Sequence, residues 1–179
     1  MVGVALALAH IAVANSELRE RPTMALKMVR YRDAVSFPLP VAWKVEDEPG
    51  VQGIFYNDAP GAGTLRVSAL QWQGSNEEER NDIAKNILLP GEIETLAQGV
   101  YLKTEVKDGL EGGVALILHR WLVVLALPEN TCRLVVYTHT VTADQEKEPS
   151  IVAELETVDF AVRNAAYSSE PHLPLLDKP

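Results

Sequence analysis

The chain contains a single cysteine among its 179 residues. One thiol cannot form an intramolecular disulfide, so the cysteine content indicates neither an oxidising nor a reducing compartment. Cys132 lies inside an apolar segment with the pattern of a β-strand. We therefore expect a buried structural thiol and not a reactive one, which would need exposure and a lowered pKa.

Basic residues are also scarce. Lys and Arg number 16 against 25 Asp and Glu, which gives a formal net charge of −9. Nucleic-acid binding needs a basic surface to offset the phosphate charge, and this chain would repel a duplex. We therefore expect no nucleic-acid partner, and a neutral or basic partner fits the net charge better.

Signatures of catalysis are missing as well. Ser68, Ser75 and Ser150 have no G-x-S-x-G pattern around them. The glycine-containing segment at residues 58–63 precedes a strand pattern instead of a helix, and it lacks the Lys-Ser/Thr ending of a phosphate-binding loop. We therefore predict no enzymatic activity, with no catalytic residues and no cofactor.

No apolar run reaches the length of a transmembrane helix. Val2–Ala14 has the length of a signal peptide and ends in an A-x-A-like pattern, but no Lys or Arg precedes it. We leave three alternatives open for residues 1–34: a cleaved signal segment, a non-native extension before a start at Met24 or Met28, and a genuine N-terminal helix. The basic residues between 19 and 32 predict a solvated lead-in. We expect a cytoplasmic protein with no stable membrane insertion, and export by the N-terminal segment is the alternative.

The length and the 47% hydrophobic content fit one domain with a single core. From Val35 onward, short apolar segments alternate with Pro and Gly turns, which is typical of short strands. The expected strands are residues 35–37, 42–45, 52–56 and 64–72. We place the domain at residues 35–165 and expect a disordered tail at 166–179.

Helical patterns follow in two places. Ser75 and Glu78 have the spacing of a capping box, and the apolar residues after them share one helix face: Ile83, Ile87 and Leu88. A last helix is expected after Pro149, where apolar residues recur at helical spacing: Ile151, Leu155, Val158 and Val162. Between them, residues 92–98 are interpreted as a short helical piece and 100–106 as a strand, with turns at 107–109 and 112–113.

Two long apolar segments, 114–127 and 131–141, are separated only by Pro128-Glu129-Asn130, which predicts an antiparallel hairpin at the centre of the sheet. With a three-residue loop, Leu127 pairs with Thr131. The same register brings four residues to one face as a candidate surface cluster: His119, Trp121, Tyr137 and His139. A shift of one residue in the loop would instead pair His119 with Thr140.

Two histidines at cross-strand distance could contribute to a metal site. Zinc requires three or four protein ligands, however, and the sequence places no Asp, Glu or Cys to complete the set. We therefore interpret the four residues as a packed or half-exposed cluster without a metal ion.

Arg120 points to the opposite face, where it needs a carboxylate or a solvated edge. The acidic segments 76–79 and 144–148 are interpreted as a helix start and a solvated loop, and a docking surface for a basic partner is the alternative.

Several short motifs stand in the first half of the domain. They are F-x-L-P-x-x-W from Phe37 to Trp43, G-x-F-Y from Gly53, and G-T-L-R-V-S from Gly63. With the order of elements, these motifs resemble the PsbP-like and DcrB-like family of α/β/α sandwiches, in its uncharacterised bacterial branch, over about residues 35–164. The resemblance implies an α+β fold in which helices cover an antiparallel β-sheet. Members of this family mostly bind other proteins or serve as accessory subunits, so it implies no catalytic residues. No lipobox cysteine follows the N-terminal apolar run, so a lipoprotein like DcrB is not indicated.

We therefore expect a non-enzymatic protein-binding or accessory module whose partner is another protein. The alternative is a carrier of a small lipophilic ligand or a hydrophobic segment in a groove beside the sheet. An apolar groove with few charged groups would favour the carrier, and a solid core with one exposed apolar patch would favour the module. A cleft that combines His119, His139 and a carboxylate would favour an enzyme.

Overall fold

The computed structural model describes residues 24–48 and 52–169. Its strands are β1 (Leu26–Tyr31), β2 (Val35–Pro40), β3 (Lys44–Glu48), β4 (Gln52–Tyr56), β5 (Thr64–Gln73), β6 (Glu94–Ala97), β7 (Val100–Glu111), β8 (Val114–Ala126), β9 (Thr131–Thr142) and β10 (Ala166–Tyr167). The helices are α1 (Glu77–Leu88) and α2 (Pro149–Arg163). Neither of these helices has the length and apolar character needed to cross a membrane.

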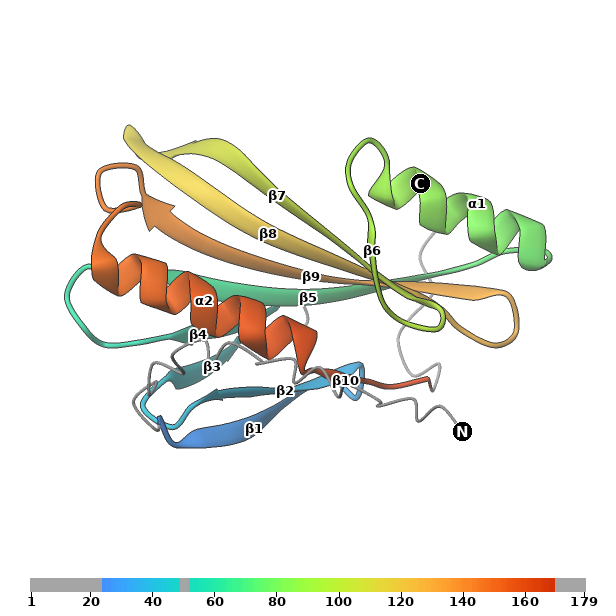
Figure 1. Cartoon of the computed structure of the whole chain (residues 1–179), viewed down its shortest axis with the longest axis horizontal. Coiled ribbons are helices and arrows are strands. Elements are labelled where there is room, and N and C mark those ends of the chain that lie inside the picture. The colour runs from blue at the N-terminus through green and yellow to red at the C-terminus, as the bar shows by residue number, and fades with distance from the viewer. Residues whose placement is uncertain (1–23, 49–51, 170–179) are drawn as a thin grey trace, which may run out of the picture.

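The described residues form two antiparallel sheets and two helices stacked in layers (Figure 1). The large sheet has seven strands in the order β3-β4-β5-β9-β8-β7-β6, and the small sheet has the order β1-β2-β10. Helix α1 packs on one face of the large sheet, and α2 and the small sheet share the opposite face. This is the predicted α+β sandwich, in which helices cover an antiparallel sheet.

The β8–β9 hairpin forms the centre of the large sheet, as predicted. In its loop, Glu129 and Asn130 both have positive φ angles, 56° and 57°, and the Thr131 N–H donates to the Pro128 carbonyl at 3.1 Å. Two successive left-handed residues are typical of a type I′ turn, whose twist suits a hairpin. The resulting register pairs His119 with His139 and Trp121 with Tyr137, which confirms the predicted pairing.

Alternate residues of the central strands face two separate apolar cores. The larger core lies between the large sheet, the small sheet and α2. In it, Phe37 is fully buried and packs edge-on against the rings of Phe55 and Tyr137 at 5.4 and 5.5 Å. Such edge-to-face pairs contribute about 0.5–1.5 kcal/mol each beyond their burial. The smaller core lies under α1, where Ile83 and Leu88 pack against apolar residues of β5, β8 and β9, so the predicted buried face of α1 is confirmed.

The small sheet begins earlier in the chain than expected. Residues 26–31, which we assigned to a solvated N-terminal extension, form β1 and pair with β2. Val29 and Tyr31 are buried while Met28 and Arg30 are exposed, which is the alternation of a strand with one buried face. Basic residues interleaved with the apolar ones concealed this pattern. Residues 166–167 of the expected tail also join the sheet as β10. The signal-like run and residues 170–179 lie outside the described residues.

Strand β2 continues through Pro38 and Pro40, where we expected it to end. The reason is that β10 pairs only with Val35 and Ser36. At both prolines β2 therefore has β1 on one side and no paired strand of the described ranges on the other, and a strand edge tolerates residues that lack an N–H.

Three other local expectations also differ from the structure. Residues 94–97 form β6, an edge strand paired with β7, and not part of a helical piece. Here the free edge of β7 overrides local propensity. Strand β7 runs through the expected turn at 107–109 to Glu111, and the turn lies at Gly112-Gly113, which both have positive φ. The N-cap of α1 is Asn76, one residue after Ser75, and its side chain accepts a hydrogen bond from the Glu79 N–H at 2.9 Å.

Glu129 is poorly suited to its backbone conformation, because the left-handed region costs most L residues about 1–2 kcal/mol and Asn tolerates it better. We expect Glu129→Asn to stabilise the protein by about 0.5 kcal/mol, seen as a higher urea midpoint with an unchanged slope. Glu111→Asn, the same change at the end of a strand, is the control and should not stabilise. A lower midpoint for Glu129→Asn would contradict the type I′ assignment.

Candidate functional site

The predicted cluster of His119, Trp121, Tyr137 and His139 comes together, but inside the fold and not on its surface. All four side chains are on the sheet face that carries α2 and the small sheet, because their positions alternate with those of the α1 face. Tyr137 and His139 are fully buried, and Trp121 is 6% exposed. Only the side chain of His119 retains moderate exposure.

Carboxylates of α2 and of the segment before it contact this cluster. The Trp121 Nε1–H donates to Asp159 Oδ1 at 3.0 Å. His139 Nε2 lies 3.2 Å from Glu154 Oε2, and His119 Nε2 lies 3.5 Å from Glu146 Oε1. The sequence analysis connected none of these carboxylates with the cluster, although Glu146 lies in the acidic segment 144–148, because helical spacing alone does not show which sheet residues a helix will contact. Their common effect is to attach α2 to the large sheet.

The environment of the cluster does not suit catalysis. Burial lowers the pKa of His119 despite the opposing effect of Glu146, so its imidazole is neutral at pH 7. Burial also raises the pKa of Tyr137 well above its usual value. The fully buried imidazole of His139 offers no surface to a substrate. Within residues 24–48 and 52–169, no three His, Cys, Asp or Glu side chains are close enough together to hold a metal ion.

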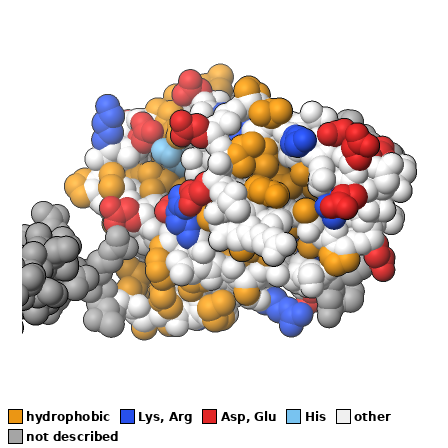
Figure 2. Space-filling view, turned by 45° about the vertical axis from the view of Figure 1, so that its right-hand side comes forward, with side chains coloured by type: hydrophobic (Ala, Val, Ile, Leu, Met, Phe, Trp, Pro, Cys, Tyr) orange, Lys and Arg blue, Asp and Glu red, His pale blue; other side chains and the backbone are white. Residues whose placement is uncertain are grey.

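The α1 face of the large sheet has a different character. Helix α1 lies over one end of this face and leaves the other end of the strands uncovered (Figure 1). On the uncovered part, cross-strand neighbours form a polar row: Arg66 on β5, Thr138 on β9, Arg120 on β8 and Glu105 on β7. We call this part of the sheet the open face. Another view of the molecular surface shows hydrophobic patches between charged side chains of both signs (Figure 2).

Glu105 is shared by three cations on the open face. Its carboxylate lies 2.7 Å from Arg120, 3.2 Å from Lys103 and 3.1 Å from Lys107. Arg120 thus has the carboxylate partner that the sequence analysis required. Burial alone would raise the pKa of Glu105, but hydrogen bonds from Lys107 and Lys103 and the charge of Arg120 outweigh it, so the pKa lies below its usual value. This part of the open face carries a local excess of positive charge.

Arg66 stands beside this network without a hydrogen bond or an ion pair to any residue of the described ranges. It is half-buried between Ile54 on β4 and Thr138 on β9. The edge of the open face also carries Lys44 and Glu46, which are engaged with Asp58 and with the Tyr56 hydroxyl respectively. The guanidinium of Arg66 is therefore available for an acceptor from outside.

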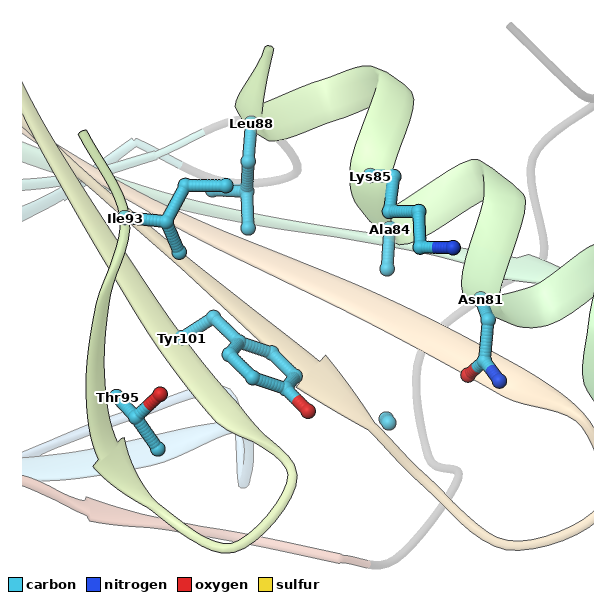
Figure 3. A pocket seen from close by; sticks show the side chains of 8 residues that line it. Asn81, Ala84, Lys85, Leu88, Ile93, Thr95 and Tyr101 are labelled. Carbon is cyan, nitrogen blue, oxygen red and sulfur yellow. The ribbon is translucent and has the colours of Figure 1, made fainter. Parts of the chain in front are cut away.

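A groove of about 360 Å³ adjoins the open face between α1 and β6. Leu88, Ile93 and Tyr101 point into it from three elements or their connections, and Lys85 and Asn81 extend from α1 at its side (Figure 3). Tyr101 precedes Lys103 and Glu105 on the same side of β7. The apolar groove and the charged open face therefore form one continuous surface.

Comparison with known proteins supports the fold and does not identify a function. No family model matches the sequence, and no curated protein matches it. A structure from Bacteroides thetaiotaomicron aligns with a TM-score of 0.54 and 16% identity over 80% of this chain, which spans only 49% of that protein. LpqN, a Mycobacterium tuberculosis protein described as involved in cell envelope biogenesis, aligns with a TM-score of 0.54 and 12% identity over 80% of this chain and 91% of its own. The Ran-binding protein Mog1p of Saccharomyces cerevisiae aligns with a TM-score of 0.45 and 14% identity over 81% of this chain and 96% of its own. At these identities the first two similarities concern the fold alone, and the third carries no weight.

Glu105→Gln removes the carboxylate that three cations share, so we expect it to destabilise the protein by about 1–2 kcal/mol at pH 7. Because the folded-state pKa of Glu105 is lowered, its contribution is present above the ordinary value of 4.5 and is lost as the pH falls through the folded-state pKa. Urea titrations of both proteins at pH 7 and at acidic pH should therefore show a difference that shrinks in acid. Glu111→Gln, at the exposed end of the same strand, is the control, and an equal loss in both variants would contradict the network.

Cys132 is buried as predicted, and its burial raises the pKa of the thiol to about 11. We expect no reaction with a thiol reagent such as iodoacetamide at pH 8 while the protein is folded, because the reactive thiolate is scarce and enclosed. Full labelling in denaturant, followed by mass spectrometry, is the positive control. Rapid labelling of the native protein would show that the α1 core opens readily.

Proposed function

We propose that the chain is a non-catalytic protein-binding module whose partner docks on the open face beside α1. The observation that carries this proposal is Arg66, a half-buried arginine on a sheet face with no acceptor among the described residues. Arginine is among the residues that most often dominate protein interfaces, because its planar guanidinium binds carboxylates through two hydrogen bonds. Folding alone does not require an unpaired arginine at this position.

The charges around Arg66 indicate the chemistry of the partner. The open face carries five cations, Arg66, Arg120, Lys103, Lys107 and, at its edge, Lys44, against two carboxylates, Glu105 and Glu46. Electrostatic complementarity then favours an acidic segment of a partner protein. The net charge of −9 favoured a neutral or basic partner, but a docked segment responds to the charges nearest to it.

The adjoining groove supplies the apolar part of the proposed interface. Ile93, which lines the groove, is 42% exposed. An apolar side chain of the partner can enter between Leu88 and Tyr101 while acidic residues of the same segment reach Arg66. A buried apolar anchor beside a polar region is the usual anatomy of a protein interface.

The fold is consistent with this role. We take the chain as a member of the PsbP-like group, in which accessory and protein-binding roles are common, and the similarity to LpqN supports the fold part of that assignment. A second candidate remains, because the groove is mostly apolar and its volume suits a small lipophilic ligand.

The test is purification of the tagged full chain from its native host, with mass spectrometry of the bound material, for the wild type and for Arg66→Glu. We expect a stoichiometric acidic protein that binds the wild type, is released as the salt concentration rises, and binds Arg66→Glu at least about tenfold more weakly. Lys107→Glu, at an exposed position of the same face, should weaken binding in the same direction. Thermal unfolding of each variant checks that the fold is intact.

Arg30→Glu is the matched control, because it makes the same substitution at an exposed position of the small sheet, on the other side of the large sheet. A partner whose binding is unchanged by Arg66→Glu, or is lost equally in Arg30→Glu, contradicts the proposed surface. A bound lipophilic small molecule in place of a protein would favour the carrier.

A further inference from the structure

A second pocket lies on the opposite face of the large sheet from Arg66, between α2 and the loops that follow β2 and β4. Its volume is about 340 Å³, which is within the range of small-molecule sites. Trp43, Pro60 and Ala62 form part of its largely apolar wall. Helix α2 contributes one stripe of residues at helical spacing: Ser150, Ala153, Glu154 and Thr157.

Glu154 is held in this pocket by two contacts to a single carboxylate oxygen. Its Oε2 accepts a hydrogen bond from the Gly63 N–H at 2.9 Å and lies 3.2 Å from His139 Nε2. His139 Nδ1 has no partner within the described residues, so Nε2 makes the one hydrogen-bond contact of this imidazole there, to Glu154. A Cβ atom on residue 63 would lie 2.1 Å from His139 Cε1, so the close approach of these groups requires glycine.

The other carboxylate oxygen, Oε1, is left for a ligand. No residue of the described ranges donates a hydrogen bond to Oε1. This oxygen is also absent from the set of described side-chain atoms that are fully buried without a partner. Oε1 is therefore accessible, and Glu154 is one of the residues that line the pocket. The residue as a whole is only 8% exposed, so the carboxylate is positioned but poorly hydrated.

No other charged side chain lines the pocket among the described residues. The lysines of the adjacent strands are engaged elsewhere: Lys27 donates to the carbonyl oxygens of Val41 and Trp43, and Lys44 pairs with Asp58. A poorly hydrated carboxylate oxygen without a donor is costly, and a cation that enters the pocket offsets that cost through a charge-assisted hydrogen bond to Oε1.

We propose that this pocket binds an alkylammonium group, with the ammonium on Glu154 Oε1 and the aliphatic chain along Trp43 and the alanine-rich wall. Ser150 and Thr157 provide hydroxyl oxygens for the remaining ammonium hydrogens. Two sources carry this group, a lysine side chain of a partner protein and a free small amine. This pocket and the open face lie on opposite sides of the large sheet. The test of the pocket is therefore independent of the test of the proposed function.

The probe is n-butylammonium chloride, titrated into the full chain at pH 7 and followed by amide chemical shifts in nuclear magnetic resonance spectra. We expect saturable binding with a dissociation constant of about 1 mM, as befits a ligand of so few atoms. The neutral analogue n-butanol should show no saturable binding. Glu154→Gln keeps an acceptor for Gly63 and His139 but removes the charge, and it should weaken binding at least about tenfold.

Glu156→Gln, at an exposed position of the same helix, is the matched control and should bind n-butylammonium as the wild type does. Ala153→Leu fills the pocket from an exposed helix position without changing the charge of the pocket, and it should also abolish binding. This second variant keeps the test valid if Glu154→Gln fails to fold. Equal binding of n-butanol, unchanged affinity in Glu154→Gln, or shifts that never saturate would each overturn the proposal.

The source of the ammonium group is distinguished by two further ligands. Tighter binding of Nα-acetyl-lysine methylamide than of n-butylammonium supports a lysine side chain of a partner. Tighter binding of 1,5-diaminopentane supports a free amine. Both results support the pocket.

Discussion

The register of the β8–β9 hairpin is the constraint on which the rest of the structure depends. Side chains alternate between the two faces of a sheet, so a slip of one residue along either strand would exchange its faces. Tyr137 would leave the core under α2 and Arg120 would enter it. Strand β5 pairs with β9, and β7 pairs with β8. A slip in the hairpin would therefore require both neighbouring strands to change their register as well. The left-handed residues Glu129 and Asn130 fix this register locally.

The open face follows from the length of α1. This helix has 12 residues and a length of about 18 Å. Strand β8 has 13 residues and, fully extended, a length of about 43 Å. The helix therefore covers less than half of the strand, and the sequence changes accordingly, from Leu122 and Val124 beneath α1 to Arg120 and Thr138 beyond it. Beyond Arg120 the same face of β8 continues with the half-buried Leu118 and Leu116, so the uncovered end combines polar and apolar side chains.

Charge is distributed unevenly over the two faces of the large sheet. On the α2 face, Glu154 and Asp159 project from a helix onto buried polar groups of the sheet and attach the helix to it. On the open face, one carboxylate is shared among three cations, and Arg66 has no ion-pair partner among the described residues. Potentials at a surface are set mainly by charges within a Debye length, about 8–10 Å. The two faces can therefore attract ligands of opposite charge, although the chain as a whole is acidic.

Four features could be predicted from the sequence: the α+β class, the hairpin register, the buried faces of α1 and α2, and the burial of Cys132. These features depend on alternation, helical spacing and a three-residue loop, which are all local. The sequence did not show β1, whose apolar residues are interleaved with basic ones, or β6, whose four residues became a strand only because the edge of β7 was free. Tertiary packing set where the four clustered residues lie relative to solvent and which carboxylates contact them. Gly63 and Glu154 are 91 residues apart, and their contact exists because α2 packs across β9 beside the β4–β5 loop. Whether a charge such as Arg66 is paired depends on everything that packs around it, and no local pattern in a sequence records that.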